Sequence, residues 1–383
     1  MKFAAHMALV LGCLAGPATQ TAMAQPAAAQ PAAAPPVALN PGLRAYRPQP
    51  VKMPADAPYL LADGSIAIVG YYDMAHILER LNALFVARHR GFKFTLLLKG
   101  TATAAPSLTF GRSAFAPMGA EFSSLEMQAY RDVLGSEPLM VRIARDPPNS
   151  KALSGPVCIF VHPDNPLTSL TVDQVARIFT AGNGTGDLTQ WRQLGLTGEW
   201  SERAIHVHSI SNSNVAGATP FMVDGWFGGR FFRPEDSPRV DPDKRDPLVS
   251  REARVANDVG AIGMHTCNIV EWRRVKILKI TPTDGGAPLS PMDVGQLMSG
   301  RYPFDRHLLI YARRDASGRV EPFIREYLRM ILSREGQRII AEAPPAGYVG
   351  GTPWTAAQLA DQSAPGYLPL SAAEAAAELA KIR

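Results

Sequence analysis

The sequence predicts an α/β fold in which strands alternate with helices, and three features of the chain support this class. The first is order: residues 65–70 form a short apolar run, residues 74–88 place apolar side chains at helical spacing, and residues 94–98 form a second apolar run. Strand, helix and strand in succession are typical of a parallel sheet. The second feature is residues 157–161, a continuous apolar run that suits a strand covered on both faces. The third is length, because residues 59–350 are enough for two lobes of ordinary size.

The first 24 residues have the layout of a secretory signal peptide. Lys2 precedes an apolar stretch that runs to residue 16, and small residues lead to Ala22-Met23-Ala24. We therefore expect cleavage after Ala24 and export to the periplasm. Cys13 follows a weak lipoprotein-type sequence, but the apolar run before it is too short for an exported segment, which disfavours lipidation. No later segment approaches the ~20 apolar residues of a membrane helix, so the mature protein is expected to be soluble.

Residues 25–58 are dominated by Ala and Pro and show no hydrophobic period. This composition predicts an extended, disordered leader rather than part of a core. The first ordered residue is therefore expected near Tyr59.

The remaining elements continue the alternation. Thr171 is a suitable N-cap for a helix over residues 172–179. Strands are predicted at residues 205–210, 260–264, 275–280 and 308–311, and helices from about residue 220 and over residues 320–332. The tail, residues 371–383, is rich in Ala and predicts a short helix without indicating where it docks.

Export would leave two cysteines, Cys158 and Cys267, in an oxidising compartment. Each lies in an apolar run, so two buried thiols are expected. A disulfide is the open alternative, because pairing needs Cα atoms within about 7 Å of each other. The absence of a Cys-x-x-Cys sequence argues against a redox-active pair.

Composition and motifs exclude several classes of protein. The formal net charge is +5 and the Lys and Arg residues form no clustered stripe, which argues against nucleic-acid binding. The chain has no Gly-x-Ser-x-Gly, His-Glu-x-x-His or P-loop sequence. We therefore expect no enzymatic activity, no cofactor and a monomeric protein.

Four segments stand out in order along the chain. They are residues 170–180 followed by Trp191-Arg192-Gln193-Leu194-Gly195, then Gly260-Ala261-Ile262-Gly263-Met264, then Tyr302-Pro303-Phe304, and finally residues 323–349, which contain Ser333-Arg334-Glu335-Gly336-Gln337. None is specific alone. Together, at these spacings, they resemble the periplasmic phosphate-binding proteins of ABC importers over residues 65–350.

The resemblance implies a two-lobed Venus-flytrap architecture, each lobe a mainly parallel sheet flanked by helices. Lobe 1 would hold residues 59–152 plus 285–383 and lobe 2 residues 153–284, with crossings near residues 154–156 and 281–282. The ligand would lie where strands end and helices begin, since helix N-termini favour anions. It would be a small solute, either phosphate or another polar or anionic molecule. The partner would be an ABC transporter permease.

The family's ligand loops map onto two parts of this sequence. In lobe 1 the candidates are Tyr72, Thr101, Thr103 and Ser113, although the Tyr72 ring could simply pack and Thr103 could only cap a helix. In lobe 2 they lie on one loop: Ser211, Asn212, Ser213, Asn214, Gly217 and Thr219.

These loops depart from the family pattern in their charged ligands. Phe115 stands where the family has an acidic residue, and Glu121 lies too far along to be its equivalent with confidence. Ala216 and Ala218 replace hydroxyl residues, and no Arg or Lys occurs in residues 204–229. The resulting loop suits a neutral polar solute or a weakly held anion better than tightly bound phosphate.

His206 and His208 flank Val207 on a predicted strand, so both rings should share one face. Without an evident third ligand they do not predict a metal site, but as titrating groups they could supply positive charge. The favoured hypothesis is a solute-binding protein whose ligand has diverged. The alternative is an interaction protein that kept the fold and lost tight ligand binding.

Overall fold

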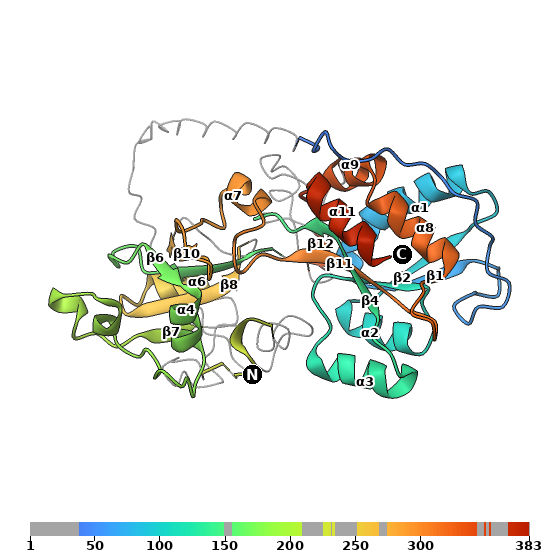
Figure 1. Ribbon diagram of the computed structural model, residues 1–383. Coiled ribbons are helices and arrows are strands. Elements are labelled where there is room, and N and C mark those ends of the chain that lie inside the picture. The colour runs from blue at the N-terminus through green and yellow to red at the C-terminus, as the bar shows by residue number, and fades with distance from the viewer. Residues whose placement is uncertain are drawn as a thin grey trace, which may run out of the picture. The chain divides into compact units, whose positions relative to one another are not determined.

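The computed structural model describes residues 38–148, 155–208, 225–230, 232–233, 251–267, 274–342, 348–349, 352–353 and 367–382 (Figure 1). These residues form a mixed α/β structure with separate hydrophobic cores for two lobes. This is the two-lobed fold class that the sequence predicts. None of the described helices is long and apolar enough to cross a bilayer.

Lobe 1 is built on five strands that carry its main core. They are β1 (Ile66–Gly70), β2 (Phe94–Leu98), β3 (Phe115–Met118), β4 (Leu139–Arg145) and β11 (His307–Ala312). β1 and β2 are parallel, and β11 lies between β3 and β4 and is antiparallel to both. Backbone hydrogen bonds from Ala114 to Ala67 and from Tyr71 to Pro117 join β1 to β3.

Helices cover both sides of these strands. They are α1 (Ala75–Arg88), α2 (Thr101–Thr109), α3 (Ser124–Leu134), α8 (Pro322–Ile331), α9 (Arg334–Glu342) and α11 (Ala372–Lys381). Figure 1 draws α2 and α3 on the opposite side of the strands from α1 and α8. The packing agrees, because α1, α8 and α9 contribute to one hydrophobic cluster and α2 to another.

Lobe 2 is organised around a sheet with the order β7-β8-β5-β9. Its elements are β5 (Val157–Val161), β6 (Ser169–Thr171), α4 (Val172–Phe179), β7 (His206–His208), α6 (Arg251–Ala256), β8 (Ala261–Thr266), β9 (Lys276–Ile277), β10 (Lys279–Thr281) and α7 (Val294–Met298). The described residues also form three 3₁₀ turns, Tyr72–Met74 in lobe 1 and Trp191–Leu194 and Gly198–Trp200 in lobe 2, and a hairpin of β12 (Tyr348–Val349) and β13 (Thr352–Pro353). The helix expected from about residue 220 falls largely outside the described residues.

The sheets are mixed, which corrects the expectation of mainly parallel sheets. β11 is antiparallel to both of its neighbours, and β5 is antiparallel to β8 and β9. β5 follows the expected passage between lobes near residues 154–156, and β11 follows Phe304, which is buried in the lobe 2 core. A strand added by such a passage has no crossover helix to impose a parallel direction.

The structure also corrects the expectation of a disordered leader up to residue 58. The described residues 38–58 form no regular element but pack against lobe 1, where Leu43 is only 2 % exposed. The Tyr46 hydroxyl and the Gln49 backbone N–H both donate to Glu326 Oε1, each at 2.9 Å. We call residues 43–49 the strap. Its anchoring depends on single side chains rather than on a hydrophobic period, so composition did not reveal it.

The C-terminal helix α11 docks on lobe 1. A capping box between Ser371 and Glu374 starts the helix. Glu374 accepts from the buried guanidinium of Arg145 at 2.7 Å, and Glu378 accepts from the backbone N–H of Arg142 at 3.1 Å. These two carboxylates fix the helix against β4.

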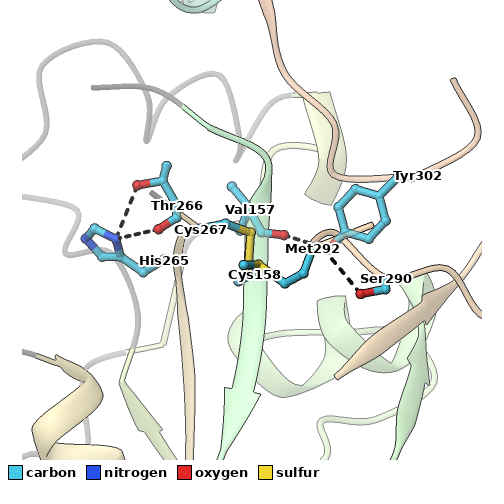
Figure 2. The surroundings of a disulfide bond; sticks show 8 residues. All are labelled: Val157, Cys158, His265, Thr266, Cys267, Ser290, Met292 and Tyr302. Atoms are coloured by element: carbon cyan, nitrogen blue, oxygen red, sulfur yellow. Dashed lines mark hydrogen bonds between the residues drawn. A yellow bond between two sulfur atoms is a disulfide. The ribbon is translucent and has the colours of Figure 1, made fainter. Parts of the chain in front are cut away.

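The second lobe extends further along the chain than expected. The crossing was predicted near residues 281–282, but Leu297, Tyr302 and Phe304 are buried in the core of lobe 2. The Tyr302 hydroxyl donates to the Val157 carbonyl at 2.7 Å (Figure 2). Packing therefore places the end of lobe 2 after residue 304.

The two buried cysteines form a disulfide, which settles the alternative that the sequence left open. Cys158 on β5 and Cys267 just after β8 have Cα atoms 5.1 Å apart (Figure 2). Their strands are antiparallel neighbours, with Cys158 opposite His265. The expectation of two free thiols was therefore wrong, because adjacency of the strands depends on tertiary pairing that no local pattern shows.

Candidate functional site

Three loops of lobe 1 meet where β1, β2 and β3 end, and we call this place the carboxyl edge. The Gly100 N–H donates to the Gly70 carbonyl at 2.9 Å, which joins the loops after β1 and β2. The Tyr71 N–H donates to the Pro117 carbonyl at 2.9 Å, which aligns β3 with them. Gly100 has φ +111°, a conformation that favours glycine.

The first loop holds two tyrosines close to the neighbouring loops. The Tyr71 ring lies across Gly119, where an added Cβ would come within 2.6 Å of it. The Tyr72 ring lies in van der Waals reach of Gly100 and 5.6 Å from the Tyr71 ring. Burial, followed by the charge of Asp73, raises the pKa of Tyr72. Tyr72 thus packs as an aromatic residue and also remains a candidate hydroxyl donor at this edge.

The two threonines of the second loop have different roles. Thr103 Oγ1 donates to the Gly100 carbonyl at 2.8 Å. The hydroxyl proton is therefore used within the first turn of α2, and Thr103 stabilises the N-terminus of this helix. Thr101 is the first residue of α2, and its hydroxyl makes no hydrogen bond to the residues that the structure describes. Thr101 is the better candidate ligand of the pair.

Ser113 has a structural role, which corrects its candidacy as a ligand. Its side chain is fully buried; the hydroxyl donates to the Phe115 carbonyl at 2.6 Å and accepts from the Val69 N–H at 2.8 Å. The hydroxyl therefore ties β1 to β3. Phe115 is also buried, with its ring 4.9 Å from that of Tyr327, so it belongs to the core.

Sequence reasoning missed several charged groups that gather near the carboxyl edge. Glu121 follows β3, and burial raises its pKa. The charge of Arg306 lowers this pKa and the charge of Asp146 raises it. Asp73 is almost fully buried and accepts from the Tyr367 hydroxyl at 2.5 Å. The Arg306 guanidinium donates to the Gly119 carbonyl, and the Asp146 N–H donates to the Arg306 carbonyl at 3.0 Å.

The only sequence signal for these groups was position, because each residue stands within three residues of a strand end. Tertiary pairing of β3, β4 and β11 is needed to bring them together. The carboxyl groups of Asp73, Glu121 and Asp146 thus lie near this edge together with guanidinium groups, since the charges of Arg306 and Arg142 both lower the pKa of Glu121. A carboxyl group beside a ligand site favours a ligand that donates a hydrogen bond to it over a fully ionised oxyanion.

The lobe 2 candidates, Ser211, Asn212, Ser213, Asn214, Gly217 and Thr219, lie outside the described residues. β7, which leads to their loop, is described. His206 Nδ1 lies 2.8 Å from Asp258 Oδ2, and His208 is buried. Among the described residues no group of three or more His, Cys, Asp or Glu side chains is arranged to hold a metal.

Comparison with known proteins gives the family. A family model described as "PBP superfamily domain" matches residues 62–335. The phosphate-binding protein PstS of Pseudomonas aeruginosa is 26% identical over 284 residues, which cover 73% of this chain and 81% of that protein. Solved structures with similarity include an ABC-type phosphate transport receptor from Vibrio cholerae (18% identity, 74% of this chain, 99% of that chain, TM-score 0.46). Another is PstS from Borrelia burgdorferi (15% identity, 72% and 96%, TM-score 0.45). Because the family model spans most of the chain and agrees with the resemblance found in the sequence, this protein belongs to the PBP superfamily.

Proposed function

We propose that this protein is a periplasmic solute-binding protein that delivers a polar solute to an ABC transporter and binds phosphate weakly at most. Membership of the PBP superfamily supports a binding rather than a catalytic role. The relative from Pseudomonas aeruginosa is by name a phosphate-binding protein, which supports a small, phosphate-like solute as the class of ligand.

The observation that carries the ligand proposal is the chemistry of the carboxyl edge. Thr101 and Tyr72 offer neutral donors there, together with the first N–H groups of α2. The guanidinium of Arg306 donates to the Gly119 carbonyl, and its charge lowers the pKa of Glu121, as does the charge of Arg142. A tightly held phosphate dianion needs a free guanidinium fork and few competing carboxylates. A neutral solute with hydroxyl or amino donors fits this edge better.

The periplasmic location has two supports. The first 24 residues have the layout of a signal peptide, with cleavage expected after Ala24. The Cys158–Cys267 disulfide suits an oxidising compartment. Mass spectrometry of periplasmic material should give a mature chain that starts at Gln25, and a lipidated chain that starts at Cys13 would contradict this.

A thermal-shift screen tests the binding role. The mature protein would be unfolded with sugars, polyols, amino acids, sulfate and phosphate, since a ligand at 100 times its Kd adds ~2.7 kcal/mol of stability. We expect a neutral polar solute to stabilise the parent and to stabilise the Thr101→Ala variant less. If no solute stabilises the parent, the alternative of an interaction protein is favoured.

The lobe 2 loop can be tested by restoring charged and hydroxyl ligands. The triple variant Asn212→Arg, Ala216→Ser, Ala218→Thr should bind phosphate at least tenfold more tightly than the parent, a gain of ~1.4 kcal/mol. A folded triple variant without any gain would contradict the proposed position of this loop at the ligand. Phe115 is not a useful site for adding an acid, because Phe115→Asp would bury a carboxylate in the lobe 1 core.

A further inference from the structure

A second pocket lies on lobe 1, formed by segments that flank the family domain. It has a volume of about 890 Å³ and is lined by the strap, by the end of α8 and by the last turns of α11. The family model covers residues 62–335, so the strap and α11 are both outside it. The pocket shares no residue with the carboxyl edge.

Four arginines surround this pocket. They are Arg44 and Arg47 from the strap and Arg325 and Arg329 from α8. Arg329 is paired with Glu326 at 2.9 Å. The other three form no ion pair with the residues that the structure describes, and no Asp or Glu lines the pocket. The lining side chains therefore carry a net positive charge, while Glu326 and Glu335 contact Tyr46 of the strap without lining the pocket.

The opposite wall is apolar. Ala376, Leu379 and Ala380 of α11 line the pocket and keep exposed surface, whereas Leu332 and Ile382 are almost fully covered by other protein atoms. Guanidinium groups bind carboxylate and phosphate oxygens in a bidentate manner, and an apolar wall binds hydrocarbon. The volume lies in the range of pockets that enclose small organic ligands.

The strap and α11 are both held against lobe 1 by hydrogen bonds to carboxylates. Glu326, with 2 % of its side chain exposed, accepts hydrogen bonds from Tyr46 and Gln49 of the strap. Glu374 and Glu378 fix α11 through Arg145 and the backbone of β4. The arginines are therefore presented by anchored elements, which lowers the entropy that binding must overcome.

We propose that this pocket binds a small anionic amphiphile. The carboxylate or phosphate group contacts Arg44, Arg47 and Arg325, and the acyl or aryl part lies against Ala376, Leu379 and Ala380 of α11. This site is independent of the solute site at the carboxyl edge. It gives the protein a second ligand, of a different chemical class from the solute.

Calorimetry with n-octyl phosphate below its micellar concentration tests the proposal. Octyl glucoside supplies the same chain without charge, and inorganic phosphate supplies the charge without the chain. We expect octyl phosphate to bind one to one, at least tenfold more tightly than either control. Equal affinity for octyl phosphate and octyl glucoside would overturn the role of the arginines, and equal affinity for octyl phosphate and inorganic phosphate would overturn the role of the apolar wall.

Variants locate the site. Arg47→Gln combined with Arg325→Gln should raise the Kd of octyl phosphate at least tenfold without changing the melting temperature. Arg131→Gln, an exposed arginine on α3, serves as the matched control and should change nothing. Loss of octyl phosphate binding in Thr101→Ala would place the probe at the solute site and overturn the proposal.

Co-sedimentation with anionic phospholipid vesicles separates a free amphiphile from a membrane surface. We expect no sedimentation, or sedimentation that octyl phosphate abolishes. Vesicle binding that octyl phosphate does not reduce would mean that the arginines dock on a membrane, which also overturns the pocket proposal.

Discussion

Removing the disulfide should destabilise lobe 2 by several kcal/mol. Cys158 and Cys267 close a loop with a sequence separation of 109 residues. For a loop of this length the chain-entropy relation gives about 4.8 kcal/mol at 25 °C, and measured disulfide contributions are typically ~2 to 4 kcal/mol. We therefore expect a loss of about 3 to 4 kcal/mol in the Cys158→Ala, Cys267→Ala double variant.

Urea unfolding followed by tryptophan fluorescence measures this loss. The tryptophans among the described residues are Trp191, Trp200 and Trp226, and they all belong to lobe 2. With an m-value of ~2 kcal/mol/M, the midpoint should fall by roughly 1.5 to 2 M. Reduction of the parent should give the same shift. A midpoint that stays unchanged on reduction, or two titratable thiols in the oxidised mature protein, would refute the pairing.

Four further substitutions test the structural roles assigned above. Ser113→Ala leaves the part-buried Val69 N–H without its acceptor and should cost about 1 to 3 kcal/mol of unfolding free energy, whereas Thr101→Ala should leave stability almost unchanged. Burial, followed by the charge of Arg145, lowers the pKa of His307 to about 3 in the folded protein. Because the unfolded state therefore binds more protons than the folded state below pH 6.5, the free energy of unfolding should fall by ~2 kcal/mol between pH 7 and pH 5. His307→Asn should remove that part of the pH dependence. Glu326→Gln should loosen the strap and accelerate tryptic cleavage within residues 44–49, and an unchanged rate would contradict the anchoring role of this carboxylate.

The elements that local pattern alone determines were predicted well from the sequence. Thr171 begins α4 with a capping box to Gln174 at 3.1 Å, and the apolar run at residues 157–161 is the fully buried strand β5. Both depend only on residues close together in the chain. The directions of β5 and β11 depend on where the chain passes between lobes, and no local period encodes that.

The candidate site was predicted only in part, because the role of a polar side chain depends on its tertiary neighbours. Ser113 and Thr101 are both hydroxyl residues near a strand end, yet one joins two strands and the other has its hydroxyl at a helix start. The approach of Arg306 to Gly119 joins residues that lie far apart in the sequence. The roles of the lobe 2 loop residues stay predictions.

Calorimetric titration of the phosphate-stripped mature protein with phosphate at neutral pH tests the central claim most directly. Two observations predict weak binding: the carboxyl edge, where the Arg306 guanidinium donates to the Gly119 carbonyl and lies near Glu121, and the absence of Arg and Lys from residues 204–229. The account predicts a Kd above 1 μM, which corresponds to a binding free energy weaker than about −8.2 kcal/mol. A micromolar or tighter Kd that Thr101→Ala weakens would show that phosphate is the ligand and would contradict the account.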